Sequence, residues 1–185
     1  MKVLLVDFYD SFTFNVVHYL ENLGCDVDIV RNDKLDFQTI QNYNGIILSP
    51  GPGLPNEKEN LIHIISTYQG EIPILGVCLG MQAIGIHLGG VLKNQNFVKH
   101  GKEGILSVVK QGALLQTVNS GMKIGLYHSW AITDLNEKYV LGYSSEGVIM
   151  AIECLEKKLF GVQFHPESIL TENGIVIFKN FINQL

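Results

Sequence analysis

The sequence predicts an α/β protein in which a doubly wound, mostly parallel central sheet carries additional antiparallel strands. The first half alternates short apolar runs, typical of buried strands, with segments whose apolar residues recur at helical spacing. Repeated strand–helix–strand units favour a parallel sheet with helices on both faces. The second half contains short β-rich runs separated by glycines, which predict antiparallel strands that extend the sheet.

The elements of the first half are expected from their apolar patterns and from the residues that end them. A buried strand at Val3–Val6 is followed by an amphipathic helix at Phe12–Leu23, and Gly24 suits the left-handed conformation that often ends a helix. Further strands are expected at Val27–Val30, Gly45–Ser49 and Pro73–Val77, and further helices at Asn60–Tyr68 and Met81–Leu88.

The second half is expected to add short strands and a closing helix. The strands are Ile105–Val109, Lys123–Tyr127, Val140–Tyr143, Val148–Ile152 and Leu159–Phe164, and the helix is Ile175–Ile182. Since the sequence contains no internal repeat, low-complexity segment or linker, residues 1–185 are expected to form one domain.

Composition and charge argue against several classes of protein. With 46% apolar and 17% charged residues, the chain has the composition of an ordinary globular protein. The formal net charge of -5 argues against non-specific binding to nucleic acid, and the longest apolar stretches are too short for a membrane-spanning helix. Cys25, Cys78 and Cys154 are too widely spaced for a disulfide framework or a zinc site, which favours a reducing cytoplasm.

Cys78 lies just after the expected strand Pro73–Val77. The sequence Gly76-Val77-Cys78-Leu79-Gly80 has the spacing Gly-x-Cys-x-Gly, the thiol version of the nucleophile elbow Gly-x-Ser-x-Gly. In such an elbow the backbone of the nucleophile is strained, and the two glycines remove side chains that would clash. Unpaired N–H groups at the start of the following helix favour a thiolate. The pattern predicts a nucleophile, and a buried structural cysteine is the alternative.

His165 is the histidine best placed to be the base that a catalytic cysteine needs. It follows the expected strand Leu159–Phe164 and begins the sequence His165-Pro166-Glu167. In extended backbone, residues two apart face the same side, so His165 and Glu167 are expected to approach the same thiol, with the carboxylate orienting the imidazole. An exposed turn is the alternative, whereas a metal site is disfavoured because the chain has no His-Glu-x-x-His pattern.

The loop Ser49-Pro50-Gly51-Pro52-Gly53 follows another expected strand. Its glycines permit conformations closed to other residues and its prolines stiffen it, so it can offer a backbone N–H to an oxyanion beside the N–H of Leu79. A plain β-turn is the alternative. Because ligands bind beyond the carboxyl ends of parallel strands, this loop, the segment Asp7–Ser11 and Cys78 are expected to share one edge.

Taken together, these elements resemble the class I glutamine amidotransferases, and within them the small glutaminase subunit of anthranilate synthase and 4-amino-4-deoxychorismate synthase. The resemblance runs almost end to end, with its blocks in the family's order, and implies a flavodoxin-like fold. The matching blocks are Asp7–Asn15, Val30–Asp33, Leu48–Gly53, Gly76–Ile84, His100–Lys102, Tyr127–Ser129 and Gln163–Thr171.

The resemblance implies that Cys78 attacks the side-chain amide of L-glutamine and forms a γ-glutamyl thioester. His165 would move the proton from the thiol to the departing ammonia, and Glu167 would orient His165. The same resemblance places glutamine and its oxyanion against Gly51, Pro52, Gly53, Leu79, Gln82, Ser129 and Trp130.

A partner is also implied, because ammonia released into neutral water is largely protonated and no longer nucleophilic. The family supplies a larger chorismate-binding synthase subunit, which receives ammonia through an internal passage and makes either anthranilate or 4-amino-4-deoxychorismate. Neither a metal nor a cofactor is expected in this chain, and Mg²⁺ is expected only in the synthase. The residues that resemble the partner interface are Asp10, Ser11, Gly101 and Lys102.

The chain departs from the subfamily pattern at positions that leave the expected catalytic residues intact. Met81 stands where histidine is usual, Leu126 stands where arginine usually precedes Tyr-His-Ser, and Trp130 replaces a common leucine. His128 is expected to be a core or strand-end histidine. Two other functions stay open: a catalytically silent module that regulates a partner, and another cysteine hydrolase, such as a peptidase or a γ-glutamyl hydrolase.

Overall fold

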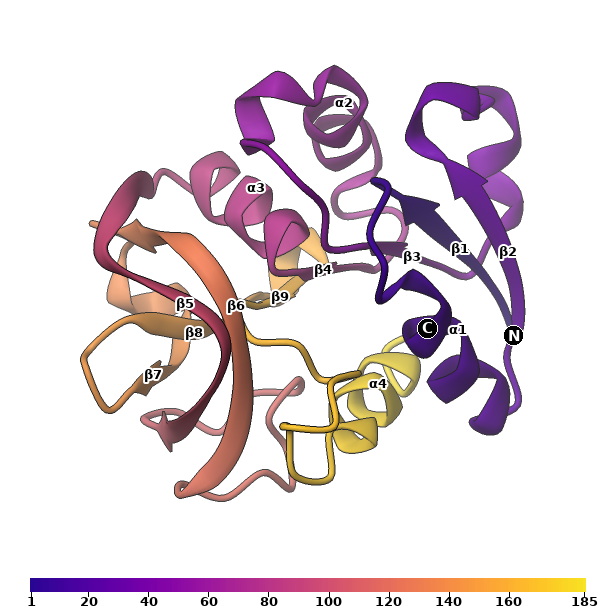
Figure 1. Ribbon diagram of the computed structural model, residues 1–185. Helices are drawn as coiled ribbons and strands as arrows, with labels where there is room; N and C mark the ends of the chain where they lie inside the picture. Colours follow the sequence, from indigo (N-terminus) through magenta and orange to yellow (C-terminus); the bar gives the residue numbers. More distant parts are fainter.

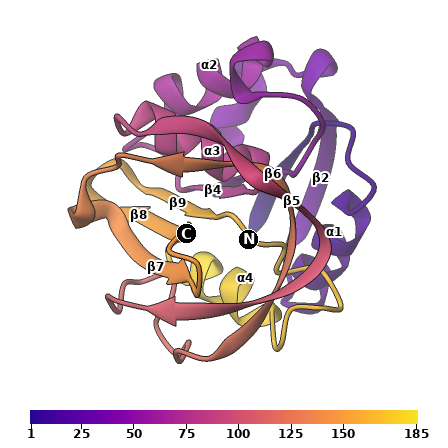
Figure 2. The ribbon, with the colours of Figure 1, turned by 60° about the vertical axis from the view of Figure 1, so that its left-hand side comes forward.

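Within the described residues, nine strands form one sheet with the spatial order β2-β1-β3-β4-β9-β8-β7-β5-β6 (Figure 1 and Figure 2). The structure is a computed structural model that describes residues 1–185, apart from the side chains of Asn96 and Phe97. The strands are β1 (Lys2–Asp7), β2 (Asp26–Arg31), β3 (Gly45–Leu48), β4 (Ile74–Val77), β5 (Val91–Val108), β6 (Met122–Thr133), β7 (Val140–Ser144), β8 (Ile149–Cys154) and β9 (Leu159–Val162).

The sheet has a parallel half and an antiparallel half. Strands β2, β1, β3, β4 and β9 pair in parallel, whereas β9, β8, β7, β5 and β6 pair antiparallel. The predicted fold class is therefore confirmed: a doubly wound parallel sheet to which the second half adds antiparallel strands. Since β1, β3, β4 and β9 run in the same direction, the segments that follow them meet at one edge of the sheet.

Helices cover both faces of the parallel half (Figure 1). The helices are α1 (Thr13–Asn22), α2 (Glu59–Tyr68), α3 (Leu79–His87) and α4 (Ile175–Ile182), and short 3₁₀ turns lie at Asn32–Lys34, Phe37–Asn42, Pro55–Glu57, Glu137–Tyr139 and Leu155–Lys157. Leu5 packs in one core with residues of α1 and α4, and its neighbour Leu4 packs in the other core with residues of α2 and α3. This explains why β1 is apolar on both faces. No helix of the described residues is long and apolar enough to cross a membrane.

Strands β5 and β6 are much longer than the expected strands Ile105–Val109 and Lys123–Tyr127. They pair from Val91 to Leu106 with two irregularities, and Gly101 has a positive φ of 66° at the second of them. The segment before Ile105 is rich in Lys, Asn and Gly and lacks alternating apolar residues, so its strand is not visible in the sequence. Pairing with β6 makes it a strand.

The turn between β4 and α3 has the strained backbone that the Gly-x-Cys-x-Gly spacing predicts. Cys78 has φ 51° and ψ -99°, a conformation that non-glycine residues rarely adopt. A Cβ on Gly76 would lie 2.5 Å from the carbonyl oxygen of Gly80, and a Cβ on Gly80 would lie 2.6 Å from the carbonyl oxygen of Leu48. Both glycines are therefore required for α3 to start this close to β3 and β4.

We expect Gly76→Ala to lower the free energy of unfolding by about 3 kcal/mol, because its methyl group would overlap backbone atoms that cannot move aside. Gly45→Ala is the matched control, since the three atoms nearest to its Cβ all belong to the side chain of Leu185 at the end of the chain. The control should cost less than about 1 kcal/mol. Urea unfolding measures both values, and equal losses of stability would contradict this account of the turn.

Candidate active site

Cys78 is held at the start of α3 by hydrogen bonds on both sides. Its N–H donates to the carbonyl oxygen of Val162 at 2.8 Å, and its carbonyl oxygen accepts from the N–H of Gln82 at 3.0 Å. Only 8% of Cys78 is exposed. Leu79 is the first residue of α3, so its N–H has no acceptor within the helix and is available to an oxyanion.

His165 and Glu167 form a buried pair in the segment that follows β9. Nδ1 of His165 lies 2.7 Å from Oε1 of Glu167, and the two residues are 2% and 3% exposed. The N–H of His165 donates to the carbonyl oxygen of Gly125 in β6 at 3.0 Å. The rings of Phe12 and Tyr127 pack against the imidazole, with centroids 5.3 and 4.9 Å away. The imidazole is thus fixed by a carboxylate, a strand and two aromatic rings.

The backbone around Pro166 differs from the extended segment that the sequence predicted. Strand β9 ends at Val162, and the N–H of Ser168 donates to the carbonyl oxygen of His165 at 3.1 Å, which closes a turn with Pro166 at its second position. The expected pairing of His165 with Glu167 is present, but the prediction of extended backbone is wrong. A turn, which proline favours at this position, brings the two side chains together.

The electrostatic surroundings of His165 favour its protonated form. Burial alone would lower its pKa, but polar interactions with the thiol of Cys78 and the carboxylate of Glu167 outweigh burial and raise the pKa of His165 to about 10. Nε2 of His165 is buried and has no hydrogen-bond partner of normal geometry among the described residues.

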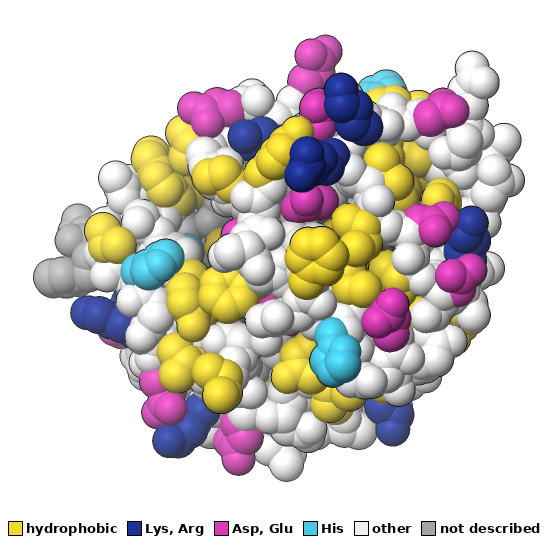
Figure 3. Space-filling view, turned by 45° about the vertical axis from the view of Figure 1, so that its right-hand side comes forward, with side chains coloured by type: hydrophobic (Ala, Val, Ile, Leu, Met, Phe, Trp, Pro, Cys, Tyr) yellow, Lys and Arg dark blue, Asp and Glu magenta, His cyan; other side chains and the backbone are white. Residues whose placement is uncertain are grey.

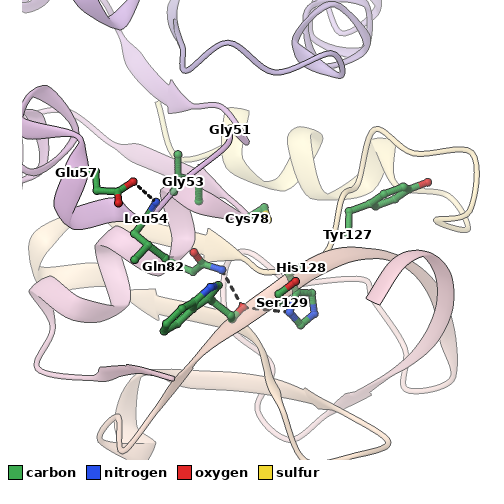
Figure 4. Close-up of a pocket in the computed structure, with 11 residues that line it drawn as sticks. Gly51, Gly53, Leu54, Glu57, Cys78, Gln82, Tyr127, His128 and Ser129 are labelled. Atoms are coloured by element: carbon green, nitrogen blue, oxygen red, sulfur yellow. Dashed lines mark hydrogen bonds between the residues drawn. The ribbon is translucent and has the colours of Figure 1, made fainter. Parts of the chain in front are cut away.

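A cavity of about 390 Å³ opens beside Cys78 on the side of α3 (Figure 4). Six of the seven residues expected to contact glutamine line it, and Leu54, Glu57, Tyr127 and His128 complete its wall. The six are Gly51, Gly53, Leu79, Gln82, Ser129 and Trp130. Pro52 does not line this cavity. Gly53 adopts a positive φ of 85°, so the loop turns just after Pro52.

A second cavity of about 420 Å³ lies on the side of His165. It is lined by Pro52, by Asp10 and Ser11 from the segment after β1, and by His100 from β5. Gly51, Cys78 and Tyr127 line both cavities, so Cys78 lies where the two meet. The expected sharing of one edge by the segment after β1, the Pro50–Gly53 loop and Cys78 is thus observed. Gly101 and Lys102 are exposed on β5 next to His100.

Gln163 is a residue at this site to which the sequence analysis assigned no role. Its Nε2 donates to the sulfur of Cys78 at 3.5 Å, and its Oε1 accepts from Nε2 of Gln82 at 3.2 Å. The same nitrogen of Gln82 donates to the carbonyl oxygen of Trp130 at 2.9 Å, as the dashed line in Figure 4 shows. The one feature of the sequence that draws attention to Gln163 is its position two residues before His165. This position alone does not reveal that the side chain contacts the thiol.

His128 is buried, and a hydrogen bond to the backbone holds its ring. Its Nδ1 lies 3.1 Å from the carbonyl oxygen of Trp130, and burial lowers the pKa of His128 to about 4. The ring is thus neutral at physiological pH, and Nδ1 donates to that oxygen. Two of the departures from the subfamily, Met81 and Leu126, are buried in the two cores, which explains why apolar residues are tolerated there.

Among the described residues, no cluster of three or more His, Cys, Asp or Glu could hold a metal ion. A thiol, an imidazole with a raised pKa and a carboxylate are the components of nucleophilic catalysis by cysteine.

Residues 4–185 match the family model described as Glutamine amidotransferase class-I. The chain belongs to this family. It is 42% identical over 189 residues to anthranilate synthase component 2 of Cyanophora paradoxa, with 99% of each chain covered. It is 39% identical over 194 residues to anthranilate synthase component 2 of Pseudomonas putida, with 100% of this chain and 98% of the relative covered.

Other matches of this amidotransferase chain include a longer protein and a solved structure. It is 39% identical over 193 residues to the bifunctional protein TrpGD of Thermotoga maritima, but spans only 32% of that protein's length. The crystal structure of a putative GMP synthase protein from Thermoplasma acidophilum has a TM-score of 0.89 and 26% identity, with 100% of this chain and 93% of that chain covered.

We expect Glu167→Gln to lower the pKa of His165 by about one to three units. In this variant only Cys78 would remain to counteract the lowering of the pKa by burial. The measurement is an NMR titration of histidine-labelled protein between pH 5.5 and 11, a range that includes the wild-type midpoint near 10. His128 is an internal control, since burial already keeps its ring neutral over this range. If His165 titrates at the same pH in both proteins, Glu167 does not hold the proton on the imidazole.

Proposed function

We propose that this chain is the glutaminase subunit of a chorismate-using synthase, which hydrolyses L-glutamine and passes the ammonia to a larger subunit. The observation that carries the proposal is the meeting of Cys78, at a strained turn, with the buried pair of His165 and Glu167 at the junction of two cavities. Family membership over nearly the whole chain supports it.

In the first half of the proposed reaction, the sulfur of Cys78 attacks the side-chain amide carbon of glutamine. A carbon–sulfur bond forms, and the carbonyl oxygen becomes an oxyanion that the N–H of Leu79 and an N–H of the Pro50–Gly53 loop can stabilise. Protonated His165 then donates its Nε2 proton to the amide nitrogen. The carbon–nitrogen bond breaks, ammonia leaves, and a γ-glutamyl thioester remains.

In the second half, His165 is neutral and can accept a proton from water. The water oxygen attacks the thioester carbon, the carbon–sulfur bond breaks, and glutamate leaves while Cys78 and protonated His165 are restored. Glu167 keeps Nδ1 of His165 protonated in both halves, so Nε2 is always the nitrogen that exchanges protons with substrate.

The cavity beside α3 has polar groups that suit the α-amino acid end of glutamine. Since Nε2 of Gln82 already donates to Trp130 and to Gln163, only its Oε1 is left for a ligand, and that oxygen can accept from the α-ammonium group. The carboxylate of Glu57 on the same wall also favours the ammonium group. We assign Gly51, Gly53, Leu79, Gln82, Ser129 and Trp130 to glutamine binding, and we move Pro52 to the second cavity.

The second cavity is the proposed exit for ammonia and the proposed place of the partner. Exposed large hydrophobic side chains follow the strands that end at this edge: Tyr9 and Phe14 after β1, and Ile169, which is 98% exposed, after β9. Figure 3 shows a face on which hydrophobic side chains gather towards the middle and most charged ones lie towards the margin. Asp10, Ser11, Gly101 and Lys102 remain our proposed interface residues at this edge.

The names of the relatives favour one partner. Anthranilate synthase component 2 is the name of several relatives that this chain covers almost completely. We therefore propose an anthranilate synthase, with 4-amino-4-deoxychorismate synthase as the second candidate because the sequence resembles both small subunits. A cytoplasmic location is part of the proposal, and the three cysteines are free, as a reducing compartment requires.

We expect Cys78→Ser to abolish glutamine-dependent synthesis while leaving ammonia-dependent synthesis by the partner unchanged, because only the release of ammonia needs the thiol. The synthase that co-purifies with the tagged chain is assayed with chorismate and either glutamine or an ammonium salt. Cys154→Ser is the control, since Cys154 is also free and buried but lies outside both cavities. Loss of both activities in Cys78→Ser would contradict the division of labour.

The same preparation separates the other functions. No glutamate from glutamine at any partner concentration would indicate a silent regulatory module. Cleavage of peptides or γ-glutamyl chains with inert glutamine would indicate another cysteine hydrolase. The product that forms from chorismate identifies the synthase: we expect anthranilate, and 4-amino-4-deoxychorismate would assign the chain to the second candidate.

A further inference from the structure

Gln163 lies directly after β9, and its side chain is completely buried beside Cys78. Its exposed fraction is 0%, and its backbone N–H donates to the carbonyl oxygen of Met150 at 2.9 Å, which fixes where the side chain starts. From there the amide reaches the sulfur of Cys78 with Nε2, at 3.5 Å, a normal length for a hydrogen bond to sulfur. No described pocket is lined by Gln163, so its amide meets the thiol from within the protein rather than from the substrate side.

The orientation of the Gln163 amide is determined by its neighbours. Gln82 presents an N–H to it at 3.2 Å, and the same nitrogen is oriented by its second hydrogen bond, to the carbonyl oxygen of Trp130. Since Gln82 donates, Gln163 must turn its oxygen towards Gln82 and its NH₂ group towards the sulfur. The amide is therefore a fixed donor aimed at Cys78.

A fixed donor at this place has different effects on the two forms of the sulfur. A thiol is a weak acceptor, whereas a thiolate accepts a charge-assisted hydrogen bond that is roughly twice as strong as a neutral one. Water cannot supply this bond from the same side, because Cys78 is 8% exposed and Gln163 fills the interior next to it. The amide thus stabilises the thiolate relative to the thiol. In the proposed reaction this helps before the sulfur attacks glutamine and again when the sulfur leaves the thioester.

We propose that Gln163 is a positioning residue, which holds the sulfur of Cys78 in place, donates a hydrogen bond that is stronger to a thiolate than to a thiol, and connects the sulfur to the cavity wall through Gln82. A glutamine that binds at Oε1 of Gln82 polarises the chain of amides that ends on the sulfur. The inference rests on the proposed role of Cys78 as nucleophile. Asn180 provides a comparison: it is also a buried amide, but its Nδ2 donates only to the carbonyl oxygen of Leu114, far along the chain from the site.

The test is the rate at which iodoacetamide alkylates Cys78 in the full chain as a function of pH. The Cys78→Ser chain gives the background from Cys25 and Cys154. Gln163→Met keeps the length of the side chain but removes the donor, so we expect the midpoint of the pH profile to move upwards by about one pH unit. In Gln163→Glu a carboxylate faces the sulfur, so the midpoint should move further upwards than in Gln163→Met.

Asn180→Leu is the matched control, because it removes a buried amide of similar size without touching the site. It should lower the melting temperature and leave the midpoint of alkylation unchanged. With the partner synthase and saturating glutamine, Gln163→Met should also lower kcat about tenfold or more. Midpoints for both Gln163 variants equal to that of the wild type would overturn the proposal, whatever the loss of stability.

Two further outcomes keep the inference distinct from the proposed function. If Cys78 of the wild-type chain is not alkylated above the Cys78→Ser background, the proposed nucleophile is wrong and the inference falls with it. If neither Gln163 variant folds, the side-chain NH₂ signals of Gln163 in the NMR spectrum of the wild type carry the test. Their chemical shifts should follow the pH profile of alkylation, and constant shifts would overturn the inference.

Discussion

The close packing of α3 against β3 and β4 is the constraint on which the rest of the site depends. Gly76 and Gly80 allow the helix to begin within van der Waals distance of the strands, and Cys78 between them takes up the strained backbone angles. Such angles cost on the order of 1–3 kcal/mol, which the surrounding packing must offset. As a result, the thiol lies at the edge of the sheet beside a helix N-terminus, whose unpaired N–H groups can stabilise the oxyanion of the proposed reaction.

The order of the strands then brings the other proposed catalytic groups to the thiol. Strand β9 lies next to β4 although about 80 residues separate them, because the antiparallel strands of the second half return the chain to the centre of the sheet. The carbonyl oxygen of Val162 accepts a hydrogen bond from the backbone N–H of Cys78, and the side chain of Gln163 donates one to its sulfur. His165 follows two residues after Gln163. The segment at one strand end therefore supplies the backbone anchor, the hydrogen-bond donor and the proposed base. Glu167 and Cys78 together overcome the effect of burial and keep the imidazole protonated.

Much of this arrangement could be predicted from the sequence because it depends on local rules. The elbow glycines, the positions of the parallel strands and the closing helix at Ile175–Ile182 follow from sterics and apolar spacing. The pairing of His165 with Glu167 was also predicted, but for a wrong reason, since the backbone turns at Pro166 instead of running straight.

The parts that could not be predicted depend on contacts between distant segments. The first half of β5 has no strand pattern of its own and is a strand only because β6 pairs with it. Pro52 was expected beside the same ligand as Gly51 and Gly53, but it lines the second cavity and not the cavity beside α3. The hydrogen bond from Gln163 to Cys78 joins residues 85 positions apart, which no local pattern reports.

The central claim is that the sulfur at this strained turn forms a covalent bond to the carbon skeleton of glutamine. The direct measurement is mass spectrometry of the chain with its synthase, quenched in acid during turnover of glutamine and digested. The account predicts a peptide with one γ-glutamyl group on Cys78 that disappears when glutamine is exhausted. Steady formation of glutamate with Cys78 unmodified at every time point, or with the group on another residue, would contradict it.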